Sequence, residues 1–270
     1  MLDDEAGREE RLEEAWRALE DGEVDGAVAI ARGLLATDGA DPEVLYLAGS
    51  ALMEADLTEE AEHYLRLALQ SCPTHNDARA ALAQLLFDRC KFGEAWTEVG
   101  ILLDADPEDA RAHHLASLLS ERRGEYARAE EEERMAHRLA PEAFSVPPRF
   151  TREEFDAAVE EAIAELPAEV RERMGNLAVV VEDVPSLRLL RALDAPSPSL
   201  LGLFVGTPLP EQSLGDLPRP PDAIYLFKRN LERISETRTE LIEEIRITLL
   251  HEVGHFMGLD EGQIGESGFE

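Results

Sequence analysis

The chain has 270 residues, of which 58 are acidic and 26 basic, so its formal net charge at neutral pH is −32. This length suits two domains that each bury a core, and the acid excess argues against nucleic acid or anionic lipid as partners. The opening MLDDEAGREERLEEAW lacks the basic and apolar regions of a secretory signal, and no stretch reaches the roughly 18 apolar residues of a membrane span, so we expect a cytoplasmic protein without a membrane segment.

A period of 34 residues runs through the first half of the chain. The positions that keep it are the alanines Ala27, Ala61, Ala95 and Ala129 and the prolines Pro73, Pro107 and Pro141. Two further positions keep the same interval, three residues before and seven residues after each alanine. Agreement at four positions of the unit indicates a structural repeat rather than chance similarity.

Each repeat has the pattern of two antiparallel helices. A small residue at the alanine position allows the second helix to approach the first, and the proline stops one helix before the next begins. The segment GEYARAEEEERMAHRLAP shows helical spacing followed by such a stop. These features predict a helical domain of about four repeats over residues 1–141, with units that begin near Pro42, Asn76 and Ala110.

This pattern resembles the tetratricopeptide repeat. In that family the stacked helix pairs form a solenoid whose concave face usually binds a peptide or another protein. The resemblance therefore implies a protein or peptide partner or substrate for residues 1–141. The alternative is that the repeats only stack and shield the neighbouring domain; the oligomeric state stays open.

The cysteines and histidines of this half carry no predicted chemistry. Cys72 and Cys90 are the only cysteines, and their spacing matches no zinc or redox motif, so we expect two buried, unpaired side chains. The histidines are expected on the surface or in the core; they are His63, His75, His113, His114 and His137.

A second domain is predicted over residues 151–270, after a proline-rich linker at 142–150. Thr151 and Glu154 form the sequence pattern of a capping box, and an apolar stripe then runs to Pro167. The expected strands are Leu177–Glu182, Leu200–Gly206 and Ala223–Phe227, with a proline-rich loop between the last two. A second capping pattern at Thr237 and Glu240 opens a long final helix that ends at Gly258. These elements indicate a small α+β domain.

The final helix carries the motif HEVGH, with His251 and His255 four positions apart. That spacing corresponds to about 40° of rotation and roughly 6 Å of rise, so both imidazoles can reach one Zn2+ ion. Glu252 lies beside them and could take a proton from a water molecule at the ion, as a catalytic base does. The alternatives are a metal site without catalysis, and two exposed helix histidines beside an ordinary glutamate.

A third ligand is expected just after this helix. Gly258 is the natural helix stop, because glycine adopts the left-handed conformation without strain. The chain can then fold back, and it offers Glu261 or the adjacent Asp260 to the ion. Gly254 is expected to allow close backbone packing beneath the site.

The second domain resembles the zincin-like metallopeptidase family of small bacterial proteins. The resemblance covers residues 149–265 and includes LAVVVEDVPS, LLGLFVGTPL, PDAIYLFKRNL and IRITLLHEVGHFMGLDE. It implies one zinc ion held by His251, His255 and an acid at 260 or 261, with Glu252 as catalytic acid and base. In larger zincins an edge strand aligns the substrate, and Tyr225–Phe227 is expected to take that role here.

The expected architecture is therefore a tetratricopeptide-type α-solenoid followed by a small α+β zincin-like domain. Only nine residues follow Glu261, which leaves no room for the methionine turn and C-terminal subdomain that complete the cleft in larger zincins. An open zinc site would need the repeats to present a substrate to it. The sequence thus favours a zinc-dependent hydrolase, most directly a metallopeptidase, over the alternative of a protein-interaction scaffold with a structural or vestigial zinc site.

Overall fold

The computed structural model describes residues 2–175, 177–193, 196–211 and 222–267. These residues form two compact units, Met1–Phe144 and Ser145–Glu270, which meet within the segment 142–150 that the sequence assigns to a linker. Most of the expected proline-rich loop, residues 212–221, lies outside the described residues. Among the helices that are described, none is both long enough and apolar enough to cross a membrane.

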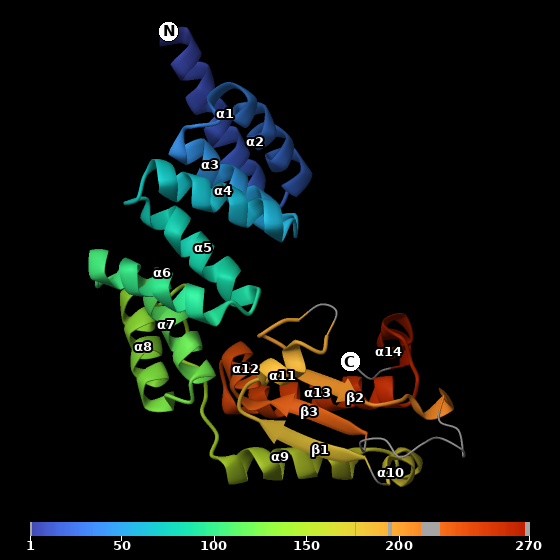
Figure 1. Cartoon of the computed structure of the whole chain (residues 1–270). Helices are drawn as coiled ribbons and strands as arrows, with labels where there is room; N and C mark the ends of the chain where they lie inside the picture. The colour runs from blue at the N-terminus through green and yellow to red at the C-terminus, as the bar shows by residue number, and fades with distance from the viewer. Residues whose placement is uncertain (1, 176, 194–195, 212–221, 268–270) are drawn as a thin grey trace. The chain divides into compact units, whose positions relative to one another are not determined.

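The first unit is a series of helix pairs (Figure 1). Its helices are α1 (Leu2–Glu20), α2 (Val24–Asp38), α3 (Pro42–Glu54), α4 (Thr58–Ser71), α5 (Asn76–Asp88), α6 (Phe92–Ala105), α7 (Ala110–Arg122) and α8 (Tyr126–Leu139). Helices α3, α5 and α7 begin at the three residues that the repeat pattern predicts. Each even-numbered helix after α2 begins 34 residues after the previous one, so the period of the sequence is the period of the structure.

Small side chains at the repeat positions hold each pair together. Ala27, Ala61, Ala95 and Ala129 are all fully buried, at 0 % exposure, where the second helix of a pair meets the first. Gly49 on α3 is tighter still, because a β-carbon there would lie 2.6 Å from the side chain of Leu65 on α4. The predicted role of the alanine position is therefore confirmed.

The turn inside each pair also follows the 34-residue period. Gly22, Asp56, Cys90 and Gly124 occupy equivalent positions, and all four have a positive φ between 56° and 75°. Glycine adopts this conformation without strain, whereas aspartate and cysteine do so at some cost. The expectation that the two cysteines are buried is wrong: both are partly exposed free thiols, and Cys90 lies at this turn between α5 and α6 rather than on a helix face that packs in the core.

The start of each later pair is capped at equivalent positions. Asp41 and Asp109 each accept hydrogen bonds from two backbone N–H groups of the following helix, and His75 accepts one from Ala78 through Nδ1. Pro73, Pro107 and Pro141 each stand two residues after the end of a helix, as expected for residues that cannot continue one. These local signals explain why the helix boundaries recur so regularly.

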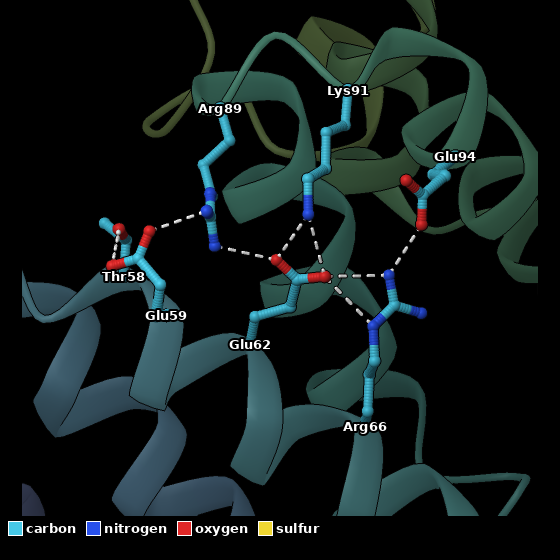
Figure 2. Close-up of polar contacts among 7 residues, drawn as sticks. All are labelled: Thr58, Glu59, Glu62, Arg66, Arg89, Lys91 and Glu94. Atoms are coloured by element: carbon cyan, nitrogen blue, oxygen red, sulfur yellow. Dashed lines mark hydrogen bonds and ion pairs between the residues drawn. The ribbon is translucent and has the colours of Figure 1, made fainter. Parts of the chain in front are cut away.

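A cluster of charged side chains joins the second and third pairs (Figure 2). The carboxylate of Glu62 on α4 accepts hydrogen bonds from Arg66, Arg89 and Lys91 at 2.8–3.1 Å. Arg66 also donates to Glu94 on α6. Only 13 % of the Glu62 side chain is exposed, so it makes these contacts in a partly desolvated position. One carboxylate therefore links α4 to the turn between α5 and α6.

The second unit combines a small sheet with several helices (Figure 1). Its helices are α9 (Arg152–Glu165), α10 (Ala168–Met174), α11 (Leu187–Leu190), α12 (Lys228–Ile234), α13 (Arg238–Phe256) and α14 (Glu261–Ser267), and its strands are β1 (Ala178–Glu182), β2 (Gly202–Val205) and β3 (Ala223–Phe227). The three strands, α9 and α13 are confirmed. The sequence missed α10, α11, α12 and α14, so α13 is not the final helix.

The sheet order is β1-β3-β2, with β1 parallel and β2 antiparallel to the central strand β3. The expectation that Tyr225–Phe227 forms the edge strand beside the site is wrong, because β3 pairs on both sides. The strand at that edge of the sheet is β2. Helix α13 packs against α9, β2 and β3, and it buries Leu241, Ile245, Leu249 and Val253 completely.

The Glu62 cluster generates a prediction about pH-dependent stability. Burial raises the pKa of Glu62, but the hydrogen bonds from Lys91 and Arg66 more than offset this and hold the pKa below its usual range. A carboxylate whose pKa falls on folding stabilises the protein above its unfolded pKa of about 4.3, and this contribution is lost as the pH falls through the lower folded value. We expect Glu62→Gln to lower the free energy of unfolding of the first unit by roughly 1–2 kcal/mol near pH 7.

Urea unfolding followed by tryptophan fluorescence tests this expectation, because both tryptophans, Trp16 and Trp96, lie in the first unit. The difference between parent and variant should shrink steadily below about pH 4. Glu59→Gln is the matched control, since the Glu59 side chain is 79 % exposed and forms its ion pair with Arg89; its effect should stay below about 0.5 kcal/mol. Equal losses for Glu62→Gln at about pH 7 and pH 3.5 would contradict the electrostatic explanation.

Candidate metal centre

Helix α13 positions three residues of the predicted site. Its first turn is capped by Thr237, whose hydroxyl accepts from the Glu240 N–H, while the Glu240 side chain accepts from Glu236 instead of completing the expected box. The apolar stripe of α13 faces the core, which leaves His251 and His255 partly exposed, with side-chain exposures of 34 % and 29 %. The two imidazoles therefore extend from adjacent turns toward a pocket.

The chain reverses direction after α13. Gly258 has a φ of +87°, so it ends the helix in the left-handed conformation that the sequence predicts. Helix α14 then packs back on α13, where the buried Ile264 lies over Gly254. A β-carbon on Gly254 would be only 2.9 Å from Ile264, so the absence of a side chain there permits the close packing expected beneath the site.

This reversal brings Glu261 to the two histidines. The Nε2 atoms of His251 and His255 are 3.1 Å apart, and the Glu261 carboxylate oxygens lie 3.5 Å from the first and 3.3 Å from the second. One donor atom from each residue falls within 4.8 Å of the others. Donors on a tetrahedral ion with bonds of about 2.0–2.2 Å are roughly 3.3–3.6 Å apart. The separations in the structure thus suit a small divalent cation.

Asp260, the other expected ligand candidate, makes different contacts. Its Oδ1 accepts from the Gln263 N–H at 2.9 Å, and the Gln263 side chain accepts from the Asp260 N–H at 3.0 Å. This reciprocal pair caps the start of α14. Asp260 therefore fixes the short helix that carries Glu261.

Glu252 lies beside the three donors but faces the sheet. Its side chain is buried, and Oε2 accepts a hydrogen bond from the Phe204 N–H of β2 at 2.6 Å. Burial raises the pKa of Glu252 to about 7, and the Phe204 hydrogen bond and nearby His255 offset the rise only in part. A carboxyl group with a pKa near neutrality can accept and release a proton in turn.

Strand β2, which contacts Glu252, has a glycine where helix α13 packs closely against it. A β-carbon on Gly202 would lie 2.7 Å from Thr248 and 2.9 Å from Glu252, so only glycine lets α13 pack so near β2. Phe204 also packs edge-on against Phe256 of α13. The sequence analysis missed both residues, although an isolated glycine inside a predicted strand is a signal of close backbone approach.

Helix α12 fixes the entry to this strand. The buried Asn230 donates through Nδ2 to the carbonyl oxygens of Pro198 and Leu200, at 2.9 and 2.6 Å. Leu200 lies just before β2 and lines the pocket. The KRNL segment after β3 had no predicted role, and no sequence signal showed that its asparagine would reach a segment some 30 residues earlier.

The pocket itself has a volume of about 570 Å³. One wall is β2, and another is the α13–α14 turn with the two histidines, Glu252 and Glu261. Pro208 and Pro210 add a further apolar wall, and Pro210 lies against Gly258, where a β-carbon would approach it to 2.7 Å. The second unit by itself therefore forms a pocket next to the two histidines.

Comparison with known proteins gives one family match and several structural likenesses. Residues 174–268 match the model of the zincin-like metallopeptidase family. No curated protein gives a match to the chain. Residues 41 to the end of MamA from Desulfovibrio magneticus RS-1 are 20 % identical, with a TM-score of 0.44 over 62 % of this chain and 89 % of that one.

Two other solved structures are similar at the same level. TTC0263, a thermophilic TPR protein in Thermus thermophilus, is 18 % identical, with a TM-score of 0.46 over 62 % of this chain and 87 % of that one. PilF of Pseudomonas aeruginosa is 18 % identical, with a TM-score of 0.47 over 58 % of this chain and 67 % of that one. The eight paired helices with a 34-residue period are of tetratricopeptide-repeat type, and the part of the chain that follows them, over residues 174–268, is a zincin-like domain.

Proposed function

We propose that the second unit binds one Zn2+ ion through His251, His255 and Glu261 and hydrolyses an amide bond, most directly a peptide bond. The observation that carries this proposal is the convergence of the three donors, at 3.1–3.5 Å, beside the buried carboxylate of Glu252. A zinc ion held there supplies a Lewis acid that polarises a carbonyl and makes water more acidic. Two imidazoles and one carboxylate are a donor set that suits zinc and leaves a position open.

Glu252 is proposed to carry the proton during hydrolysis. Its Oε2 is held by the Phe204 N–H, so the carboxylate is fixed in orientation next to the histidines. In its ionised form it takes a proton from the attacking water, and it then delivers that proton to the amine that leaves. Its largely buried position strengthens these exchanges, because little solvent competes for the proton.

The edge strand β2 supports a peptide as the substrate. Strand β3 covers one side of β2, and the Leu201 carbonyl accepts from Phe227 there, so by alternation Gly202 and Phe204 direct their backbone groups to the other side. On that side the Phe204 N–H donates to Glu252, so a peptide would pair with the backbone groups of Gly202 and with the Phe204 carbonyl. An extended peptide can add to such an edge through main-chain hydrogen bonds. The pocket next to it is lined by Leu203, Pro208 and Leu259, which favours an apolar side chain.

The first unit is proposed to bind a protein partner or substrate for this site. Its support is the tetratricopeptide-type pairing, since stacked helix pairs present an extended surface made by the first helix of each pair. None of the three proposed metal ligands lies in residues 1–141, so the two functions can be tested separately.

A scaffold without catalysis is the second candidate. The observation that favours it is the short hydrogen bond of Glu252 to Phe204, because a carboxylate that fastens α13 to β2 has a structural role even if it moves no proton. In that case the metal would only hold α13 and α14 together. Replacement of Glu252 separates the two candidates, as described below.

Replacement of the proposed ligands should remove the metal. We expect His255→Ala to reduce bound zinc from about one per chain to a small fraction, and Glu261→Gln to weaken zinc binding by roughly 10- to 100-fold. Elemental analysis and competition with a chromophoric chelator measure these changes. Asp260→Asn is the matched control, because its side-chain oxygen can still cap α14. If Asp260→Asn lost zinc while Glu261→Gln kept it, the assignment of the third ligand would be wrong.

Replacement of the proposed base should abolish hydrolysis without removing the metal. We expect Glu252→Gln to lower the rate of peptide cleavage by at least about 100-fold while zinc content stays near one per chain, because the amide keeps the shape but cannot carry the proton. Cleavage is measured as new amino termini released from a peptide library. A variant that cleaves as fast as the parent would support the scaffold instead.

The packing of α14 on α13 should affect zinc affinity even when no proposed ligand is replaced. Gly254→Ala places a methyl group against the buried Ile264, so α14 must shift and move Glu261 away from the histidines. We expect zinc binding to weaken by about 10-fold, as measured by chelator competition. Gly262→Ala on α14 is the control, since its β-carbon meets only Asp260 at 3.5 Å and should leave zinc affinity unchanged. Equal affinities for the two variants would contradict this packing argument.

A further inference from the structure

A second pocket lies entirely within the first unit. It has a volume of about 240 Å³ and is lined by the first helices of three successive pairs, α3, α5 and α7. The residues that matter here are Tyr46 and Met53 from α3, Asp77 and Ala80 from α5, and Arg111 and His114 from α7. We call this pocket the repeat groove. It combines apolar side chains with a few polar groups, as many ligand sites do.

The chain's own Phe144 lines the repeat groove. Its ring stacks on the imidazole of His114, with centroids 4.8 Å apart and an angle of 25° between the planes. Its carbonyl oxygen lies 2.7 Å from Nδ1 of His137 on α8, and its N–H donates to the Ala140 carbonyl. One aromatic side chain and its flanking backbone are therefore held together, although they belong to no helix or strand.

The groove also offers polar groups to an extended backbone. Arg111 donates to the Asp77 carboxylate at 2.7 Å, and about half of each side chain remains exposed. The Tyr46 hydroxyl can donate a hydrogen bond, and burial and the charge of Asp77 raise its pKa above the usual value. Together these groups provide hydrogen-bond donors and an acceptor with no excess charge of either sign, which suits the amides of a peptide better than an ion.

We propose that the repeat groove binds an extended protein segment through an aromatic side chain that stacks on His114, and that Phe144, which already stacks there, is a built-in competitor that such a segment displaces. This deepens the protein-binding role proposed above for the repeats by naming the class of ligand and a residue that competes with it. Phe144 is tethered a short stretch of chain after the end of α8, so it acts at a high effective concentration. A competing segment binds only the fraction of molecules in which the groove is open, and its apparent affinity falls by that fraction.

A peptide with the chain's own sequence tests the proposal. The probe is the fluorescently labelled peptide APEAFSVPPR, which corresponds to residues 140–149, and fluorescence anisotropy measures its binding to the full chain. We expect Phe144→Ala to bind the peptide at least about 10-fold more tightly than the parent, because the chain's own phenylalanine no longer stacks on His114. Further replacement of His114 by Ala should reverse most of that gain, since the stacking partner is lost.

Three controls accompany this experiment: a neighbouring variant, a changed peptide and a test of folding. Val146→Ala alters an exposed apolar residue two positions later and should bind the peptide like the parent. A peptide with alanine in place of phenylalanine should not bind any variant. Circular dichroism and the fluorescence of Trp16 and Trp96 establish that the helices of Phe144→Ala remain folded.

The proposal is overturned if Phe144→Ala binds no more tightly than the parent, if the peptide without phenylalanine binds equally well, or if Phe144→Ala dimerises so that a second copy fills the groove. None of these outcomes depends on zinc or on Glu252. A failure here would therefore leave hydrolysis by the second unit to be judged on its own measurements.

Discussion

The proposed metal centre depends on how closely α13 approaches its two neighbours. Gly202 lets Thr248 and Glu252 lie directly on β2, and Gly254 lets Ile264 of α14 lie directly on α13. Without the first approach the Phe204 N–H would not reach the carboxylate of Glu252, and without the second Glu261 would not reach the histidines. Two histidines four residues apart on a helix provide only a pair of donors; the packing at these two glycines completes the site.

The sequence predicted the parts of this site that depend on local geometry. His251, Glu252 and His255 share one helix, so their relation follows from 3.6 residues per turn, and Gly258 ends that helix because of its own backbone freedom. The strand order could not be predicted in this way. Strand β3 follows β2 in the chain but lies between β1 and β2 in the sheet, a long-range arrangement that no local pattern specifies, and the edge was therefore assigned to the wrong strand.

Helix α14 shows a different limit of sequence analysis. The segment EGQIGES holds two glycines in seven residues, and its local preference is against a helix. The capping pair of Asp260 and Gln263 starts the helix, and the burial of Ile264 on Gly254 stabilises it. Tertiary packing thus overrides propensity at the segment that carries the proposed third ligand. In the repeats, by contrast, local preference and tertiary packing agree. The same caps, turns and small residues recur at equivalent positions, and each favours the same helix boundaries.

Several ion pairs in the first unit lie between successive helix pairs. Stacked pairs touch only their neighbours, so the interfaces between pairs limit the stability of the whole array. Ion pairs cross these interfaces at several places. They are Arg8 with Asp41, Arg32 with Glu60, Arg66 with Glu94, Arg89 and Lys91 with Glu62, and Arg111 with Asp77.

Exposed ion pairs contribute little individually, whereas a shared and partly buried carboxylate such as Glu62 contributes more. In a chain with a net charge of −32, each such cation also relieves repulsion between acidic helices. Six basic residues of the first unit therefore lie in contacts that join successive pairs. The pair of Arg111 and Asp77 belongs to this set and also lines the repeat groove, so the contacts that stack α5 on α7 are the same ones that shape the surface offered to a bound segment.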